Sequence, residues 1–373
     1  MKQGLDRSIL NIDGLVGDLP HQERARFRRI FRVSIATEEL CPPGPMYPWI
    51  EAHFGAVEAV SRQRIVKITN LVTWEGSLFN ELRARRPIEA LEAGDLAAII
   101  RESERDPFCE PLLGTPEDIF GRVEGRYSIT ASNIAKYDGF HGLVIFNHHN
   151  PLVFTLEEFN DWIETALLWA KRAHHQNEEF KYFFLLWNCL WRSGASIVHG
   201  HLQMTLGCDM HYAKIECLRR AALAYRSTHG CNYFDDLCRV HRALGLAHEN
   251  EGAHLLAYLS PVKEKELLII ADQLDEGFKN STFKALRFFR DRLGVTSFNL
   301  AIYMPPLAEV EEDWSGFPVM ARLVDRGHHM TKTADIGAME LYAASVIASD
   351  PFRVIEALGV QLGDGASIPA LLQ

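Results

Sequence analysis

Short apolar runs alternate along this chain with longer stretches in which apolar residues recur at helical spacing. The short runs are rich in β-branched and aromatic residues, which is typical of strands. We expect strands at residues 65–74, 126–133, 142–146, 182–187, 197–204, 253–260, 266–271, 297–304 and 318–324. The helical spacing predicts helices at residues 21–31, 49–60, 155–175, 214–251 and 275–293.

One arrangement of strands around a long helix occurs twice. The first helix begins at the capping box Thr155-Leu-Glu-Glu, and the second lies within the strand-rich stretch 253–324. We therefore predict an α+β fold of two related antiparallel sheets with flanking helices. The expected organisation is an N-terminal helical accessory segment at 1–64, a first repeat at 65–210 that carries the catalytic residues, and a degenerate second repeat at 211–373.

Composition and charge exclude several classes of protein. The chain has 373 residues, 47% hydrophobic and 24% charged, which is enough for a substantial core. Its net charge of −10 gives no sign of a nucleic-acid surface. No apolar run approaches the roughly 20 residues of a membrane span, and the N-terminus lacks a long apolar signal region. Seven cysteines without a C-x-x-C pair favour a reduced, cytoplasmic setting.

The candidate chemistry lies in the stretch Asn188 to Gln203. His199, His201 and Gln203 are separated by two, so that in a strand all three side chains would project from one face. A neutral imidazole, with a pKa of about 6.5, is a good nucleophile towards phosphorus, and a carboxamide can donate hydrogen bonds to phosphoryl oxygens. Gly200 would let other backbone approach closely on the opposite face. A chance pair of histidines, or a metal site, would also explain H-x-H.

The wider pattern resembles the galactose-1-phosphate uridylyltransferase family and its nucleotidyltransferase relatives in the histidine triad superfamily. The matching positions are Asn188, Gly194, Ser196, His199, His201 and Gln203. The resemblance implies that His201 takes up a nucleoside monophosphate and that Gln203 stabilises the bound phosphoryl. Ser196 and Asn188 would hold the phosphates. The triad hydrolases have a third histidine where Gln203 stands, so the glutamine favours transfer over hydrolysis.

Weaker similarities extend from about residue 65 to 360, and the resemblance implies that the two sheets are histidine-triad-like half-barrels. Arg83 and Arg86 match two arginines that approach the substrate phosphates in the family, and Asn133 matches a nucleotide-contacting asparagine. Lys332 and Glu340 roughly match the acceptor loop, but their spacing departs from the family pattern by two residues. The resemblance therefore implies that the second repeat forms the acceptor side of the molecule and leaves the acceptor itself open.

A structural zinc site is also implied by the resemblance. Many family members bind zinc through two cysteines, a later histidine and the first histidine of H-x-H, and here Asp106 replaces the first cysteine and Cys109 provides the second. Ungapped alignment places Asn150 at the later position, next to His149. The candidate ligands are Asp106, Cys109, His149 and His199, all of types that zinc accepts. Loss of the metal, with Cys109 an ordinary buried thiol, is the alternative.

We expect a cytoplasmic nucleotidyltransferase of carbohydrate metabolism, of the type that acts in galactose metabolism. It would move a nucleoside monophosphate from an NDP-sugar of the UDP-hexose type to a sugar phosphate by a ping-pong cycle. One alternative is a phosphorylase of NDP-sugars or dinucleoside polyphosphates that uses inorganic phosphate. Another is a nucleotide-sensing or scaffolding protein with reduced catalysis. The expected partners are a nucleotide sugar and a sugar phosphate, with no nucleic acid or membrane, and a homodimer is one assembly open to the chain.

Overall fold

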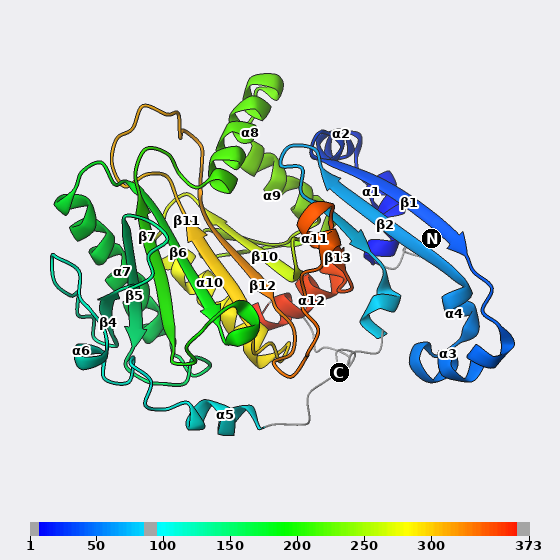
Figure 1. Ribbon diagram of the computed structural model, residues 1–373. Coiled ribbons are helices and arrows are strands. Elements are labelled where there is room, and N and C mark those ends of the chain that lie inside the picture. Colours follow the sequence, from blue (N-terminus) through cyan, green and yellow to red (C-terminus); the bar gives the residue numbers. More distant parts are fainter. Residues whose placement is uncertain (1–6, 86–94, 364–373) are drawn as a thin grey trace.

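The protein is a mixed α/β structure with two β-sheets flanked by helices (Figure 1). The computed structural model describes residues 7–85 and 95–363. The predicted fold class is confirmed, with one difference in how the predicted halves are joined. They do not form separate sheets, because their inner strands pair with each other.

The larger sheet has nine strands in the order β4-β5-β7-β6-β11-β12-β10-β9-β8, and all neighbouring strands are antiparallel. The strands are β4 (Ser128–Ser132), β5 (Phe140–Phe146), β6 (Tyr182–Cys189), β7 (His201–Gly207), β8 (Ala247–Asn250), β9 (Ala253–Ala257), β10 (Glu264–Ala271), β11 (Phe298–Tyr303) and β12 (Val319–Asp325). The order β4-β5-β7-β6 is repeated in reverse as β11-β12-β10-β9. The two predicted repeats are thus the two halves of one sheet, joined where β6 pairs with β11.

Helices α7 (Leu156–Gln176) and α10 (Glu276–Asp291) cover one face of this sheet and contact each other, and α12 (Pro351–Leu362) contacts α10. Thr155 and Glu158 form the predicted capping box at the start of α7. Trp162 and Trp169 of α7 are fully buried against the sheet, and Trp162 stacks on Phe146 of β5 with ring centroids 3.4 Å apart. The other face of the first half carries a smaller apolar cluster, formed by Phe108, Ala131, Leu143 and Ile145.

The smaller sheet has the order β1-β2-β3-β13, with β13 parallel to β3. Its strands are β1 (Phe31–Glu39), β2 (Arg62–Asn70), β3 (Gly76–Phe79) and β13 (Ser345–Ile347). The segment expected to be helical contains α1 (Ile12–Asp18), α2 (His21–Ile30), α3 (Tyr47–Phe54) and α4 (Val57–Ser61), and also β1. β1 pairs with β2 across the expected boundary at residue 64. The strand was missed because only Phe31, Val33 and Ile35 of its nine residues turn towards the core.

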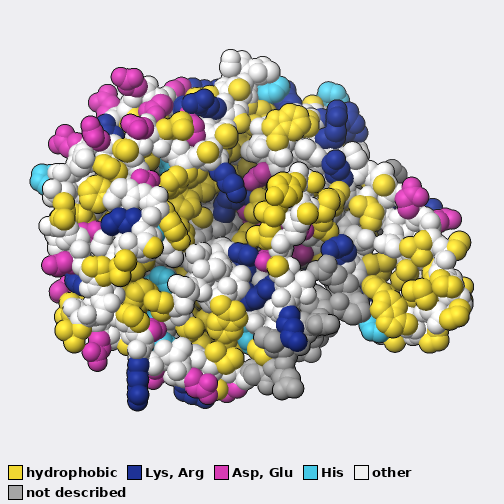
Figure 2. Space-filling model, in the orientation of Figure 1, with side chains coloured by type: hydrophobic (Ala, Val, Ile, Leu, Met, Phe, Trp, Pro, Cys, Tyr) yellow, Lys and Arg dark blue, Asp and Glu magenta, His cyan; other side chains and the backbone are white. Residues whose placement is uncertain are grey.

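A buried polar cluster joins the two sheets. Glu75, in the turn between β2 and β3, accepts hydrogen bonds from the Tyr258 hydroxyl at 2.7 Å and from Arg322 Nη1 at 2.7 Å. Arg322 of β12 also pairs with Glu266 of β10 at 2.6 Å. The smaller sheet is thereby held over the second half of the larger one. Figure 2 shows a hollow between the two, in which basic and acidic side chains gather.

The segment predicted as helical from 214 to 251 consists of α8 (Ala213–His229), α9 (Tyr233–Leu244) and β8. Gly230 and Gly245, both at positive φ, end the two helices. The short helices are η1 (Ile9–Asn11), η2 (Gly44–Met46), η3 (Glu81–Arg85), η4 (Trp191–Ser193), α5 (Leu96–Glu102), α6 (Pro111–Gly114) and α11 (Ala338–Tyr342). Among the described helices, none combines the length and apolar character needed to cross a bilayer.

Candidate active site

Strand β7 carries two of the three polar residues predicted to share a face. It begins at His201, so His201 and Gln203 lie on one face, while Leu202 and Met204 are fully buried on the other. His199 precedes the strand, and its side chain contacts a different group of residues. The predicted row of three is therefore a pair on the strand plus one histidine before it.

Gly200, between the two histidines, packs against the Phe146 ring. A Cβ atom at Gly200 would overlap the ring atoms. Phe146 is 1% exposed and stacked on Trp162, so the ring has no room to move aside. Close approach at Gly200 was predicted, but it is made by an aromatic ring rather than by backbone.

Replacing Gly200 with alanine is expected to lower the free energy of unfolding by about 1–3 kcal/mol, because overpacking forces the ring or the strand to shift. The shift should also slow any reaction at His201. Denaturant unfolding measures the first effect, with Gly17→Ala as the control, since a Cβ at Gly17 meets nothing within 4 Å. Equal stability of Gly200→Ala and the wild type would contradict this account.

His201 is held with one ring nitrogen free. Its Nδ1 lies 2.8 Å from the His199 carbonyl oxygen, which can only accept, so Nδ1 carries the proton and Nε2 carries the lone pair. Burial lowers the pKa of His201, which keeps the imidazole neutral. The ring also packs edge-on against Phe108, with centroids 5.0 Å apart. A neutral imidazole with a fixed tautomer is the form suited to nucleophilic attack.

Gln203 is two residues further along the same face. Its Oε1 lies 3.1 Å from Nε2 of His141, a fully buried residue of β5. Asn133 Nδ2 lies 3.2 Å from the same nitrogen, so the residue matched to a nucleotide-contacting asparagine borders the partner of Gln203. The structure therefore brings Asn133 and Gln203 to one end of the site.

Asn188 lies on β6, and extending the register between β6 and β7 by two residues places it beside His201. Its register partner on β11 is Asn299. Asn299 Nδ2 donates to Asn188 Oδ1 at 2.6 Å and to the Ser193 carbonyl at 2.9 Å. The second half of the sheet thus supports a residue of the first half next to the candidate nucleophile.

The other residues predicted from the resemblance are less enclosed. Gly194 and Ser196 lie on the exposed segment between η4 and β7, and Arg83 is exposed on η3. Arg86 lies outside the described residues.

The two residues matched to the acceptor loop differ in their contacts. Lys332 is exposed. Glu340 accepts a hydrogen bond from the Gly337 backbone at 2.9 Å and caps α11. Capping gives Glu340 a structural role, and a role in acceptor binding stays a prediction.

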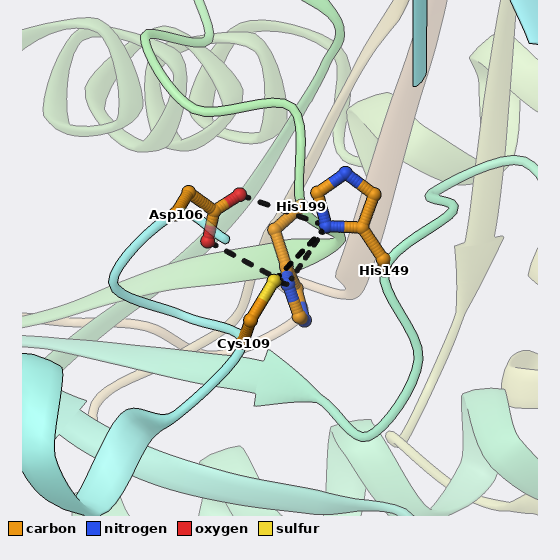
Figure 3. A group of neighbouring side chains, drawn as sticks. All are labelled: Asp106, Cys109, His149 and His199. Atoms are coloured by element: carbon orange, nitrogen blue, oxygen red, sulfur yellow. Dashed lines mark hydrogen bonds and ion pairs between the residues drawn. The ribbon is translucent and has the colours of Figure 1, made fainter. Parts of the chain in front are cut away.

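Four potential metal ligands converge next to this site (Figure 3). Asp106 and Cys109 come from the loop before α6, His149 from the loop after β5, and His199 from the segment before β7. Their ligand atoms all lie within 4.8 Å of one another. Asn150, the position given by ungapped alignment, instead accepts a hydrogen bond from the backbone of Leu152. These four residues are the predicted set.

The spacing within the cluster fits a tetrahedral ion. Cys109 Sγ lies 3.4 Å from His149 Nδ1 and 3.5 Å from His199 Nδ1, and the two Nδ1 atoms are 3.2 Å apart. The Asp106 oxygens lie 3.6 and 3.7 Å from these nitrogens. Ligands at about 2.0–2.3 Å from a tetrahedral zinc ion lie roughly 3.3–3.8 Å from each other. The separations among Cys109 Sγ and the two Nδ1 atoms lie close to this range, and the four ligand atoms together span up to 4.8 Å.

Outer contacts orient both imidazoles towards the centre of the cluster. His199 Nε2 donates to the Phe146 carbonyl at 2.9 Å, and His149 Nε2 lies 3.0 Å from the Ile100 carbonyl. In the neutral ring, each Nδ1 is therefore the nitrogen without a proton, and it faces inward, as metal binding requires. Among the described residues, Asp106 Oδ2 is buried without a hydrogen-bond partner. Cys109 is not buried, in contrast to the buried thiol expected in the alternative in which the metal is lost.

An open cleft of about 770 Å³ borders the metal-ligand cluster and includes Cys109, His149 and His199 in its lining. It gives an ion a path from solvent. His201 is not part of its lining, so the cleft belongs to the cluster rather than to the candidate nucleophile.

No protein-family model matches the chain, and no curated protein matches it. Among solved structures it is similar to an ADP-glucose phosphorylase from Arabidopsis thaliana with bound ADP-glucose, at 16% identity over 80% of this chain and 97% of that chain, with a TM-score of 0.60. A GalT-like protein from Arabidopsis thaliana is 16% identical over 78% of this chain and 97% of that one, with a TM-score of 0.56. A uridylyltransferase is 13% identical over 80% and 99%, with a TM-score of 0.54. The predicted relationship is confirmed at the level of the fold.

Sequence reasoning missed the residues that support the site from neighbouring strands, chiefly His141 and Asn299. A signal existed, because each is a polar residue inside an otherwise apolar strand. The sequence alone does not reveal which strands pair or in which register. Only the sheet order shows that these residues lie beside Gln203 and Asn188.

Proposed function

We propose that this protein is a nucleotidyltransferase that moves a nucleoside monophosphate from an NDP-sugar to a phosphate-bearing acceptor through a covalent intermediate on His201. The observation that carries the proposal is the state of the His201 ring. Its Nδ1–H donates a hydrogen bond to the His199 carbonyl, and among the described residues its Nε2 has no hydrogen-bond partner. Gln203 stands beside it on the same face. The fold shared with nucleotide-sugar enzymes supports the same conclusion.

In the first step, His201 Nε2 attacks the α-phosphorus of the donor. The N–P bond forms, the P–O bond to the leaving group breaks, and the sugar phosphate departs with the bonding electrons. The imidazole then carries a positive charge, which the His199 carbonyl stabilises through the Nδ1 proton. In the second step an acceptor oxygen attacks the same phosphorus, the N–P bond breaks, and the neutral imidazole is restored.

Gln203 and Asn188 are the groups placed to stabilise the charge that develops on the phosphoryl oxygens. Both are carboxamides, so they donate hydrogen bonds without titrating. A histidine at position 203 would add a second titrating group next to the intermediate. The glutamine therefore suits an enzyme whose intermediate waits for an acceptor other than water.

The finer assignment is a donor of the UDP-hexose type and a sugar phosphate as the acceptor. The motif resemblance supports this choice. A phosphorylase that uses inorganic phosphate is the second candidate, favoured by two observations. Glu340 of the matched acceptor loop caps a helix, and one of the similar solved structures is described as an ADP-glucose phosphorylase. Release of an NDP by phosphate alone would distinguish the phosphorylase.

We further propose that Asp106, Cys109, His149 and His199 bind one structural zinc ion. When bound, zinc would join the loops before α6 and after β5 to the segment that leads into β7. His199 would then fix the start of the strand that carries His201. Its backbone carbonyl is also the acceptor for His201 Nδ1, so the site and the cluster share one residue.

The purified protein is expected to contain about one zinc ion per chain, measured by inductively coupled plasma mass spectrometry. Cys109→Ser should reduce zinc affinity by more than roughly 100-fold, since changing even an outer partner costs 10- to 100-fold. It should also lower the melting temperature, because the ion binds the folded state. Cys41→Ser, at an exposed cysteine outside the cluster, is the matched control. Metal-free protein with wild-type stability would refute the zinc proposal.

Intact-protein mass spectrometry tests the proposed reaction directly. The protein is incubated separately with UDP-glucose, ADP-glucose, a GDP-sugar and diadenosine tetraphosphate, then quenched at alkaline pH because phosphoramidates are acid-labile. A mass gain of one nucleoside monophosphate would establish the covalent step and identify the base. Nucleotide binding without an adduct from any donor would instead support the nucleotide-sensing or scaffolding alternative.

A further inference from the structure

The direction of two carboxamides decides whether they can assist transfer at His201. A carboxamide has nearly the same shape when its NH₂ and oxygen exchange places, but only the NH₂ end donates to a phosphoryl oxygen. The oxygen end would repel the same charge. Whatever holds Gln203 and Asn188 in one direction therefore acts on the reaction without touching the substrate.

The direction of Gln203 follows from the tautomer of His141. The Tyr137 backbone N–H donates to His141 Nδ1 at 3.0 Å, so that nitrogen carries no proton. The neutral ring must then carry its proton on Nε2, which lies 3.1 Å from Gln203 Oε1. Asn133 Nδ2 is also a donor and cannot accept this proton. Gln203 therefore presents its oxygen to His141 and its NH₂ to the other side.

Burial keeps His141 in this state. The residue is fully buried, and burial lowers its pKa, so the ring stays neutral at neutral pH. The register pairs Leu143 with Gln203, which puts His141 on the same face, diagonally across from Gln203 on the neighbouring strand. Among the described residues, Gln203 Nε2 has no protein partner of its own.

The direction of Asn188 is set through Asn299. Arg326 can only donate, and its Nη1 contacts Asn299 Oδ1, which identifies that atom as the oxygen. The Ser193 carbonyl can only accept, and it takes one hydrogen of Asn299 Nδ2. The second hydrogen goes to Asn188 Oδ1 at 2.6 Å. Asn188 thus turns its NH₂ away from Asn299, and its Nδ2 has no partner among the described residues.

Arg326 is itself held in place by a carboxylate. Its Nε and Nη2 contact the two oxygens of Asp335 at 2.6 and 2.9 Å. The Asp335 side chain belongs to the loop before α11, and the Arg326 side chain is only 15% exposed. Arg326 can only donate hydrogen bonds, and Asp335 holds it in place. Asn299 therefore has one stable orientation, with its Oδ1 towards Arg326.

We propose that His141 and Asn299 are positioning residues that turn the NH₂ groups of Gln203 and Asn188 towards the phosphoryl group bound at His201. This inference rests on the proposed function and adds to it the residues that make the two carboxamides donors. The two halves of the sheet share the task. His141 acts from β5 in the first half, and Asn299 acts from β11 in the second.

A double-mutant cycle tests the role of His141. His141→Met removes the donor and fills the space, and it should slow formation of the nucleotidyl adduct roughly 10- to 100-fold, less than the 10²–10³-fold for outright loss of a donor. His141→Gln keeps a donor and should restore most of the rate. In a Gln203→Ala background, His141→Met should cost less than about twofold, since no carboxamide remains to be turned. An equal cost in both backgrounds would overturn the proposal.

Asn299→Asp gives the matching test in the second half. The introduced carboxylate keeps the contact with Arg326 but cannot donate, so Asn188 should turn its NH₂ towards that carboxylate and its oxygen towards the phosphoryl. The rate of adduct formation should fall roughly 10- to 100-fold. The melting temperature should also fall, because the carboxylate loses the hydrogen bond to the Ser193 carbonyl. In an Asn188→Ala background the further loss should vanish. A loss that persists there would assign Asn299 to support of the Ser193 turn instead.

Measurements on the wild-type protein test the proposed transfer reaction separately from the positioning roles of His141 and Asn299. If the wild type forms no adduct with any donor, the proposed function fails. Affinity for UMP, AMP and GMP, measured by calorimetry on the same variants, then tests orientation by itself. If His141→Met and Asn299→Asp weaken nucleotide binding, and this loss disappears in the Gln203→Ala and Asn188→Ala backgrounds respectively, the positioning roles are upheld. Unchanged affinities in His141→Met and Asn299→Asp would overturn them.

Discussion

Replacing His201 with asparagine is expected to abolish nucleotidyl transfer while leaving the fold intact. Asparagine can still donate to the His199 carbonyl, but it offers no nucleophile to phosphorus. Loss of a covalent nucleophile costs roughly 10⁴-fold or more in turnover. The side chain is buried, at 7% exposed, and packs against Phe108, but asparagine keeps the hydrogen bond to the His199 carbonyl, so the melting temperature should change little.

Two measurements are needed for this His201→Asn prediction. Turnover with each donor gives the size of the loss, and intact mass shows whether the adduct has disappeared. His175→Asn, an exposed histidine in the last turn of α7, is the matched control and should retain full activity. A His201→Asn protein that still forms the adduct would place the nucleophile elsewhere and refute the proposed mechanism.

Replacing Gln203 with glutamate is expected to have the second largest effect. One carboxylate oxygen can still accept from His141, so the local packing and the stability should survive. The other oxygen replaces the NH₂ group and faces the phosphoryl charge. Loss of one such donor costs roughly 10²–10³-fold in rate, and the added repulsion should bring the total to about 10³-fold.

Single-turnover formation of the adduct measures the Gln203→Glu effect without interference from product release. The matched control is Gln361→Glu on α12, where the side-chain oxygen accepts a hydrogen bond from Arg292 and a carboxylate can do the same. A Gln203→Glu protein with a normal rate would mean that the oxygen of Gln203, not its NH₂ group, faces the substrate. It would then remove Gln203 from phosphoryl stabilisation.

Most of the order of strands and helices followed from the sequence, because most of these elements have a strong local pattern. The capping box at Thr155 and the apolar stripe of α7 depend only on residues within one helix. The helix breaks at Gly230 and Gly245 are local too, yet they were missed because the flanking residues continue a helical pattern. β1 was missed for the opposite reason, since its pairing with β2, rather than its own composition, makes it a strand.

Some residues of the candidate site could also be predicted from the sequence, whereas others required the structure. The candidate nucleophile, the glutamine and the four potential metal ligands were predicted from spacing and resemblance, because residue types at a short spacing can be read directly from the sequence. The choice between His149 and Asn150 as the metal ligand depended on the bend of one loop. The structure brings His149 to the cluster and turns Asn150 to its own backbone.

By itself, the sequence determined the candidate chemistry of this protein: two histidines, a glutamine, and a set of residue types that zinc accepts. The tertiary structure decided how these side chains are oriented. The sheet order sets His141 beside Gln203 and Asn299 beside Asn188, across separations of 62 and 111 residues. Such contacts are not local, because they depend on which strands pair and in what register. The tautomer of a ring and the direction of an amide follow from those contacts alone.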